Sequence, residues 1–141
     1  MILNGIIEWQ KTRHLDEGGY NPQQSAYNFL EELAEGSGYP TIACKVIAKE
    51  LSREFTQGAP FEEIVDSRCD LIVFAIGDLL KLGVNPIDAL EETLKEISSR
   101  QQDPEQKTRW DSGGRLEGEK WQKDRLQDPS SLYKACYKAL V

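Results

Sequence analysis

The stretch EEIVDSRCDLIVFAIGDLL, residues 62–80, largely decides the fold that the chain is expected to adopt. Its two aspartates, Asp66 and Asp70, are four residues apart and share one face of a helix. Six consecutive apolar residues follow at 71–76, so this helix would be apolar nearly all round. A helix of that kind is typically buried inside a bundle. We therefore predict a helix over about 60–82, with Asp70 at the threshold of the core.

The rest of the chain also shows the apolar spacing of three and four residues that is typical of amphipathic helices. Clean hairpin turns between alternating runs are missing from the sequence. The turn sequences GGYNP, GSGYP, TQGAP and LGVNP separate the periodic runs. These observations predict an all-α bundle of four to six helices. We expect the remaining helices at about 2–16, 23–35 (with Ser25 as a candidate N-cap), 41–55 (capped by Thr41), 86–100 and 130–140.

The length of 141 residues favours one domain, 1–141, with a core that needs no disulfide. Residues 101–128 differ from the helical runs because they hold many charges and almost no aliphatic residues. We expect a long polar loop there. A loop of this length in a compact domain is usually functional or disordered.

Charge and cysteine content exclude several classes of function. The net charge of −7 makes nucleic acid and anionic membranes unlikely partners, since both attract positive protein surfaces. A phosphate ligand stays compatible with this charge, because a divalent cation can reverse the local sign. The three cysteines form no CxxC pair, which favours reduced thiols over disulfides or a zinc site. With no signal peptide and no membrane-spanning run, a cytoplasmic protein is expected.

A second acidic stretch, FLEELAE at 29–35, lies on the expected helix over 23–35. Glu35 shares a helix face with Glu31, four residues earlier, and with Glu32, three residues earlier. If this helix packs antiparallel to the one over 60–82, both carboxylate pairs reach the same space, where Mg²⁺ would relieve their repulsion. Spacing alone favours the other interpretation, in which these carboxylates face solvent.

The two acidic stretches together resemble the MazG-type all-α nucleoside triphosphate pyrophosphohydrolases, a superfamily that includes phosphoribosyl-ATP pyrophosphatases and dimeric dUTPases. EELAE matches the family pattern EExxE, and Asp70 matches the last residue of its ExxD pattern. ALEETLKEISSR (89–100) is similar to the next helix of the family, and GGRLEGEKW (113–121) to a segment that follows in several members. The resemblance covers about residues 5–125. Ser67 departs from it, because the family has a glutamate there, and Asp66 is a candidate substitute.

The resemblance implies Mg²⁺-dependent hydrolysis of (deoxy)nucleoside triphosphates to a nucleoside monophosphate and pyrophosphate, with Mn²⁺ as a substitute ion, by a homodimer or homotetramer. Four carboxylates would hold the metal: Glu32, Glu35, Asp66 and Asp70. Glu31 or Glu32 would act as the catalytic base. The substrate-binding residues would be Lys95, Arg100, Arg115, Lys120 and Trp121.

Several alternatives stay open. Lys95 could pair with Glu91 or Glu92 on its own helix, Arg100 could only favour the end of that helix, and Trp121 could pin the loop instead of stacking on a base. Because of Ser67, the chain could also be a catalytically degenerate helical module that binds a nucleotide or a protein. The sequence does not fix the preferred base or sugar.

Overall fold

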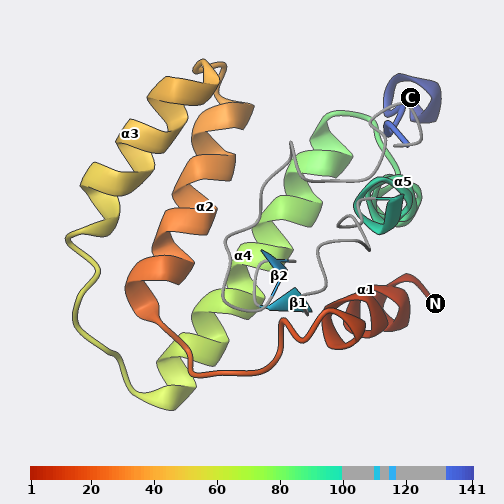
Figure 1. The fold of residues 1–141 in the computed structure, drawn as a ribbon. Helices are drawn as coiled ribbons and strands as arrows, with labels where there is room; N and C mark the ends of the chain where they lie inside the picture. Colours follow the sequence, from red (N-terminus) through yellow and green to blue (C-terminus); the bar gives the residue numbers. More distant parts are fainter. Residues whose placement is uncertain (100–109, 112–114, 117–132) are drawn as a thin grey trace. The chain divides into compact units, whose positions relative to one another are not determined.

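The structure is a computed structural model that describes residues 1–99, 110–111, 115–116 and 133–141 (Figure 1). Within these residues nearly all regular structure is helical, which confirms the prediction of an all-α protein. The exception is an antiparallel pair of strands with two residues each, in which the backbone of Trp110 is the partner of Leu116. This pair is too short to form a sheet layer. The elements are α1 (Ile2–Thr12), α2 (Pro22–Gly36), α3 (Thr41–Ser52), α4 (Phe61–Lys81), α5 (Pro86–Ser99), β1 (Trp110–Asp111), β2 (Arg115–Leu116) and the 3-10 turn η5 (Lys138–Leu140).

The chain divides into two compact units. One unit is Gly19–Cys69, and the other combines Met1–Gly18 with Asp70–Val141. The division falls within α4, and the placement of the units relative to one another is not determined. A single domain over 1–141 therefore stays a prediction.

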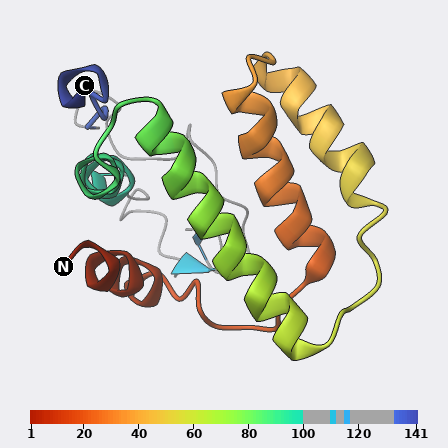
Figure 2. The same ribbon diagram turned by 180° about the vertical axis from the view of Figure 1, so that it is seen from behind.

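In the unit Gly19–Cys69, α2 and α3 lie side by side and run antiparallel (Figure 1 and Figure 2). Asn21 caps α2, because its Oδ1 accepts a hydrogen bond from the backbone N–H of Gln24 at 3.0 Å. Pro22 follows as the first helical residue, a position where its missing N–H costs nothing. The Ser25 cap is therefore a wrong prediction. The Thr41 cap is wrong too, since α3 begins after Pro40 with no side-chain cap.

In the other unit, α1 contacts α5. The approach is close at Gly5, where an added Cβ would lie 2.8 Å from Cδ2 of Leu94. The turn between α4 and α5 uses Gly83 at a positive φ of 79°. Asn85 then caps α5, because its Oδ1 accepts from the backbone N–H of Ile87 at 2.9 Å.

The apolar run of α4 is exposed in the single chain. Ile72, Val73 and Phe74 are 58%, 62% and 67% exposed, and no residue of α4 is buried. The prediction that this run lies inside the bundle is therefore wrong for the described residues of one chain, which leave its side chains exposed. Among the described residues, no helix has both the length and the apolar character needed to cross a membrane.

The C-terminal segment also differs from its prediction. Residues 133–137 are not helical, and only η5 follows them. The backbone N–H groups of Tyr133, Ala135 and Cys136 donate to side chains of α5 at 3.0, 3.4 and 3.3 Å, and so are not available to an α-helix. The predicted helix over 130–140 is therefore wrong where the structure describes it. Most of the predicted loop over 101–128 lies outside the described residues.

Candidate functional site

The three glutamates of EELAE lie in the second half of α2, beside α3. They act together on the buried thiol of Cys44 on α3, which donates to the backbone oxygen of Tyr39 at 3.3 Å. Burial raises the pKa of the Cys44 thiol, and the negative charges of Glu35, Glu31 and Glu32, in that order, raise it further. The three predicted carboxylates therefore share one neighbourhood at the contact between α2 and α3.

Glu31 differs from its two neighbours because it is partly buried, whereas Glu32 and Glu35 are exposed. The Tyr27 hydroxyl, one turn earlier on α2, lies close enough to Glu31 for the two side chains to interact. Burial raises the pKa of Tyr27, and the hydrogen bond and charge of Glu31 raise it further. Glu31 is thus the only one of the three carboxylates that is partly buried and has a hydroxyl beside it.

Both aspartates of DSRCD lie on α4 and are exposed, but they belong to different units. Asp66 belongs to the same unit as α2, and Asp70 begins the other. The side of α4 that meets α2 carries Arg68, whose guanidinium donates to Ser25 of α2. Two residues rotate a helix by about 200°, so Asp66 points to the opposite side. Within this unit the structure therefore does not bring Asp66 to the α2 carboxylates.

Arg68 is a residue that the sequence analysis did not select. Its Nη2 donates to Tyr20 Oη at 2.6 Å and to Ser25 Oγ at 3.0 Å, and its Nη1 donates to Ser67 Oγ at 3.0 Å. The guanidinium also lies over the ring of Phe29, with its carbon 5.2 Å from the ring centre. One signal was available in the sequence: Arg68 is the only basic residue between Glu62 and Asp78.

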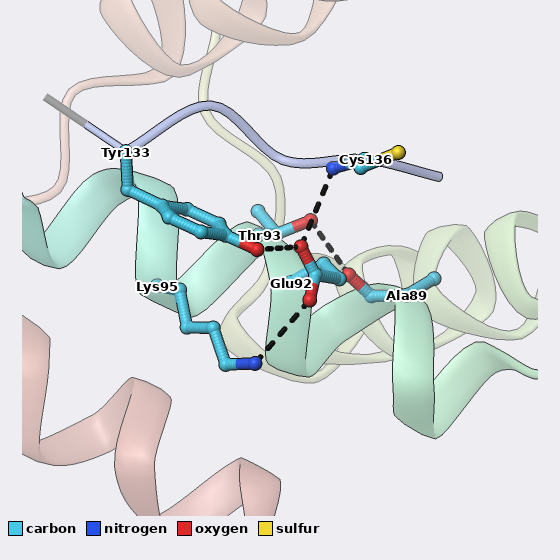
Figure 3. A network of polar contacts seen from close by, with 6 residues as sticks. All are labelled: Ala89, Glu92, Thr93, Lys95, Tyr133 and Cys136. Carbon is cyan, nitrogen blue, oxygen red and sulfur yellow. Dashed lines mark hydrogen bonds and ion pairs between the residues drawn. The ribbon is translucent and has the colours of Figure 1, made fainter. Parts of the chain in front are cut away.

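On α5, Glu92 is the centre of a network of polar contacts (Figure 3). It accepts from the Tyr133 hydroxyl at 2.5 Å, from the Cys136 N–H at 3.3 Å and from Lys95 Nζ at 3.3 Å. The Tyr133 bond, followed by the Cys136 N–H, lowers the pKa of Glu92, and Lys95 lowers it further. In the same contact, Glu92 raises the pKa of Tyr133.

Lys95 therefore pairs with a carboxylate of its own helix, one of the alternatives that the sequence left open. The Lys95 side chain of this ion pair is 62% exposed, and ion pairs with an exposed partner contribute little to stability. Arg100, Lys120 and Trp121 lie outside the described residues. The backbone of Arg115 is described as part of β2, where its partner across the strand ladder is the backbone of Asp111 in β1.

The described carboxylates meet one requirement of a metal site and not another. Their oxygens are the ligands that Mg²⁺ and Mn²⁺ prefer in proteins, so the chemistry of the donors fits. Among the described residues, however, no three His, Cys, Asp or Glu side chains gather closely enough to hold an ion. The metal site stays a prediction.

A hollow of about 340 Å³ lies between the end of α4, the start of α5 and the C-terminal segment. Its lining is apolar apart from the hydroxyls of Thr93 and Tyr137, which lie 2.8 Å apart. Since no charged side chain lines it, this hollow does not suit a phosphate.

Comparison of the chain with models of protein families, with curated proteins and with solved structures finds no match in any of the three.

Proposed function

We propose that the chain hydrolyses (deoxy)nucleoside triphosphates to a nucleoside monophosphate and pyrophosphate in a reaction that depends on Mg²⁺. The observation that carries the proposal is the placement of Glu31, Glu32 and Glu35 together in the second half of α2, beside Cys44 of α3. Three carboxylates on one helix repel one another and favour a bound cation. The order of the motifs, EELAE on α2 and then DSRCD on α4, adds support from the resemblance to MazG-type enzymes.

Each carboxylate then has a role that suits its surroundings. Glu32, Glu35 and Asp70 would hold the ion, which would neutralise the phosphate charge and lower the pKa of a bound water. The resemblance adds Asp66 to this set, although within its own unit Asp66 points away from the α2 carboxylates. Glu31 is the better candidate for the base that takes the proton of the attacking water, because it is the partly buried one of the three and lies beside Tyr27. Glu32 is the second candidate.

The basic residues of α5 and of the following segment would bind the phosphates. Lys95 can exchange its exposed contact with Glu92 for a phosphate oxygen at small cost. The other residues proposed to bind substrate are Arg100, Arg115 and Lys120 for the phosphates and Trp121 for the base.

We also propose that the chain forms a homodimer or homotetramer through α4. The exposed apolar residues Ile72, Val73 and Phe74 are adjacent on this helix, and α4 as a whole has no buried residue. Soluble monomers rarely expose contiguous apolar surface of this kind. A second copy would supply the cover that a single chain lacks.

The reaction is tested by pyrophosphate release from a panel of ribo- and deoxynucleoside triphosphates, with and without Mg²⁺. Release that needs the metal, together with a monophosphate product, is the expected result, and the order of substrates would identify the preferred base and sugar. No release from folded protein across the panel would reject the enzyme.

A binding module without turnover is the second candidate. The observation that favours it is Ser67, which stands where the family has a glutamate and accepts a hydrogen bond from Arg68. Nucleotide binding without release of pyrophosphate would support it. In that case Ser67→Glu is the first variant to examine for gain of turnover.

A further inference from the structure

Arg68 has an unusual set of partners. All three groups that accept its hydrogen bonds are hydroxyls, those of Tyr20, Ser25 and Ser67. Among the described residues no carboxylate forms an ion pair with Arg68, although 24 of the chain's residues are Asp or Glu. Arg53, by contrast, pairs with Glu50 at 3.3 Å. The positive charge of Arg68 is therefore not balanced by a described neighbour.

The hydroxyls around Arg68 keep their own protons available. A hydroxyl has one O–H donor and two lone pairs, so accepting a bond from the guanidinium leaves the O–H unused. None of these three O–H groups donates to another described residue. The Nε of Arg68 likewise donates to none of the described residues. The cluster thus offers one full positive charge and several donors, and it lacks an anionic acceptor.

The position of the guanidinium is fixed before any ligand arrives. Its carbon lies 5.2 Å from the ring centre of Phe29 and 5.7 Å from that of Tyr20, which are distances typical of cation–π contacts. Ser25 belongs to the first turns of α2, and the positive end of the helix dipole lies there. The first turn of α2 contains no acidic residue that would cancel this potential.

We propose that Arg68, with the hydroxyls of Tyr20, Ser25 and Ser67, forms a binding site for a phosphate group. A phosphate offers negative charge and several oxygen acceptors, and the planar fork of arginine matches it. The site lies within the unit Gly19–Cys69 and faces the opposite side of α4 from Asp66. It is therefore separate from Asp66, one of the carboxylates proposed to hold the metal ion.

The spacing along α2 suggests which phosphate binds. Ser25, Phe29 and Glu32 are four and three residues apart, so they follow one another along one face of the helix. Glu32 lies about 10 Å along the axis from Ser25, at 1.5 Å a residue. A triphosphate with one end at Glu32 can extend along this face toward Arg68. The site would then hold the two phosphates that leave as pyrophosphate. This assignment rests on the proposed function, whereas the binding of a phosphate group at Arg68 does not depend on it.

The test measures binding of pyrophosphate to the full chain by calorimetry in the presence of EDTA, so that neither metal nor turnover is involved. Arg68→Gln is compared with Arg53→Gln, which removes the same charge from a helical arginine that is paired with Glu50. We expect the wild type and Arg53→Gln to bind equally, and Arg68→Gln to bind at least about tenfold more weakly, the ratio that corresponds to one charged hydrogen bond. Equal binding by both variants, or no binding by the wild type, would overturn the inference.

A purely structural role for Arg68 predicts a different pattern. In that case Arg68→Gln loses helical circular dichroism, and the wild type binds no pyrophosphate. If Arg68→Gln does not fold, Ser25→Ala replaces it, because this variant keeps the arginine and removes one donor. Its affinity for pyrophosphate is expected to be several-fold lower than that of the wild type. An unchanged affinity counts against the site. Pyrophosphate binding without nucleotide turnover would reject only the proposed function. Turnover with wild-type pyrophosphate affinity in Arg68→Gln would reject only the phosphate site.

Discussion

The hydroxyl of Tyr133 donates to Glu92 over 2.5 Å and so joins the C-terminal end of the chain to α5. The same carboxylate oxygen accepts from the backbone N–H of Cys136 at 3.3 Å. One side chain therefore replaces part of the hydrogen bonding that a C-terminal helix would have made internally. Because the bonds are made to the ionised carboxylate, this attachment depends on the charge of Glu92 (Figure 3).

Acid should release the C-terminal segment. The hydrogen bonds lower the pKa of Glu92 in the folded protein from its ordinary value of 4.5. A lowered pKa means that the stabilisation is complete above about pH 4.5 and is lost as the pH falls through the lower, folded value. The Cys136 amide resonance, followed by NMR during an acid titration, should shift in this window. In Tyr133→Phe the shift should begin at higher pH, and identical titrations of the two proteins would contradict the assignment.

The C-terminal segment shows why the spacing of apolar residues did not predict its structure correctly. Cys136 and Leu140 have helical spacing, and this spacing predicted a helix. The partners that prevent it, Glu92, Glu96 and Ser99, are more than thirty residues earlier, beyond the reach of any local pattern. Spacing identified the five long helices correctly, because their hydrogen bonds are internal.

The acidic site was predictable only in part. Glu31, Glu32 and Glu35 fall on α2 as expected, since that needs helix periodicity alone. Arg68 could not be selected in the same way, because its role depends on Ser25, 43 residues earlier in the chain. The exposure of Phe74 could not be predicted for a similar reason. An apolar run indicates that its side chains are buried, but not whether the same chain or another copy covers them.

The cap of α2 provides a test of stability. Asn21→Ala removes the acceptor of the Gln24 N–H and should lower the free energy of unfolding by about 1 kcal/mol, the usual cost of losing such a cap. Thr41→Ala is the matched control, because α3 has no side-chain cap to lose. Urea unfolding of the three proteins would measure both effects. An equal loss in the two variants would show that the cap was assigned to the wrong residue.

The α4 surface gives a prediction about assembly. Light scattering of the wild type should give a mass of at least twice the 16.0 kDa of one chain. Phe74→Asp places a charge in the proposed contact and should shift the mass toward the monomer, because burying an unpaired charge is costly. Ile42→Asp on α3 is the control, since Ile42 is 80% exposed and lies outside the proposed contact. A monomeric wild type, or equal behaviour of both variants, would remove α4 from the interface.

Asp70 offers the sharpest test of the proposed metal site. The sequence assigns it to the second acidic motif, and it lies exposed on α4. Asp70→Asn keeps the size of the side chain and removes its charge, so turnover should be lost and Mg²⁺ binding weakened while the circular dichroism is unchanged. Asp78→Asn is the control, because Asp78 is also exposed on α4 and has no proposed role. Calorimetric titration with Mg²⁺ separates loss of the ion from loss of a later step. If Asp70→Asn keeps both turnover and metal binding, the ion must be held without α4's second aspartate, and the resemblance to the ExxD pattern loses its functional meaning.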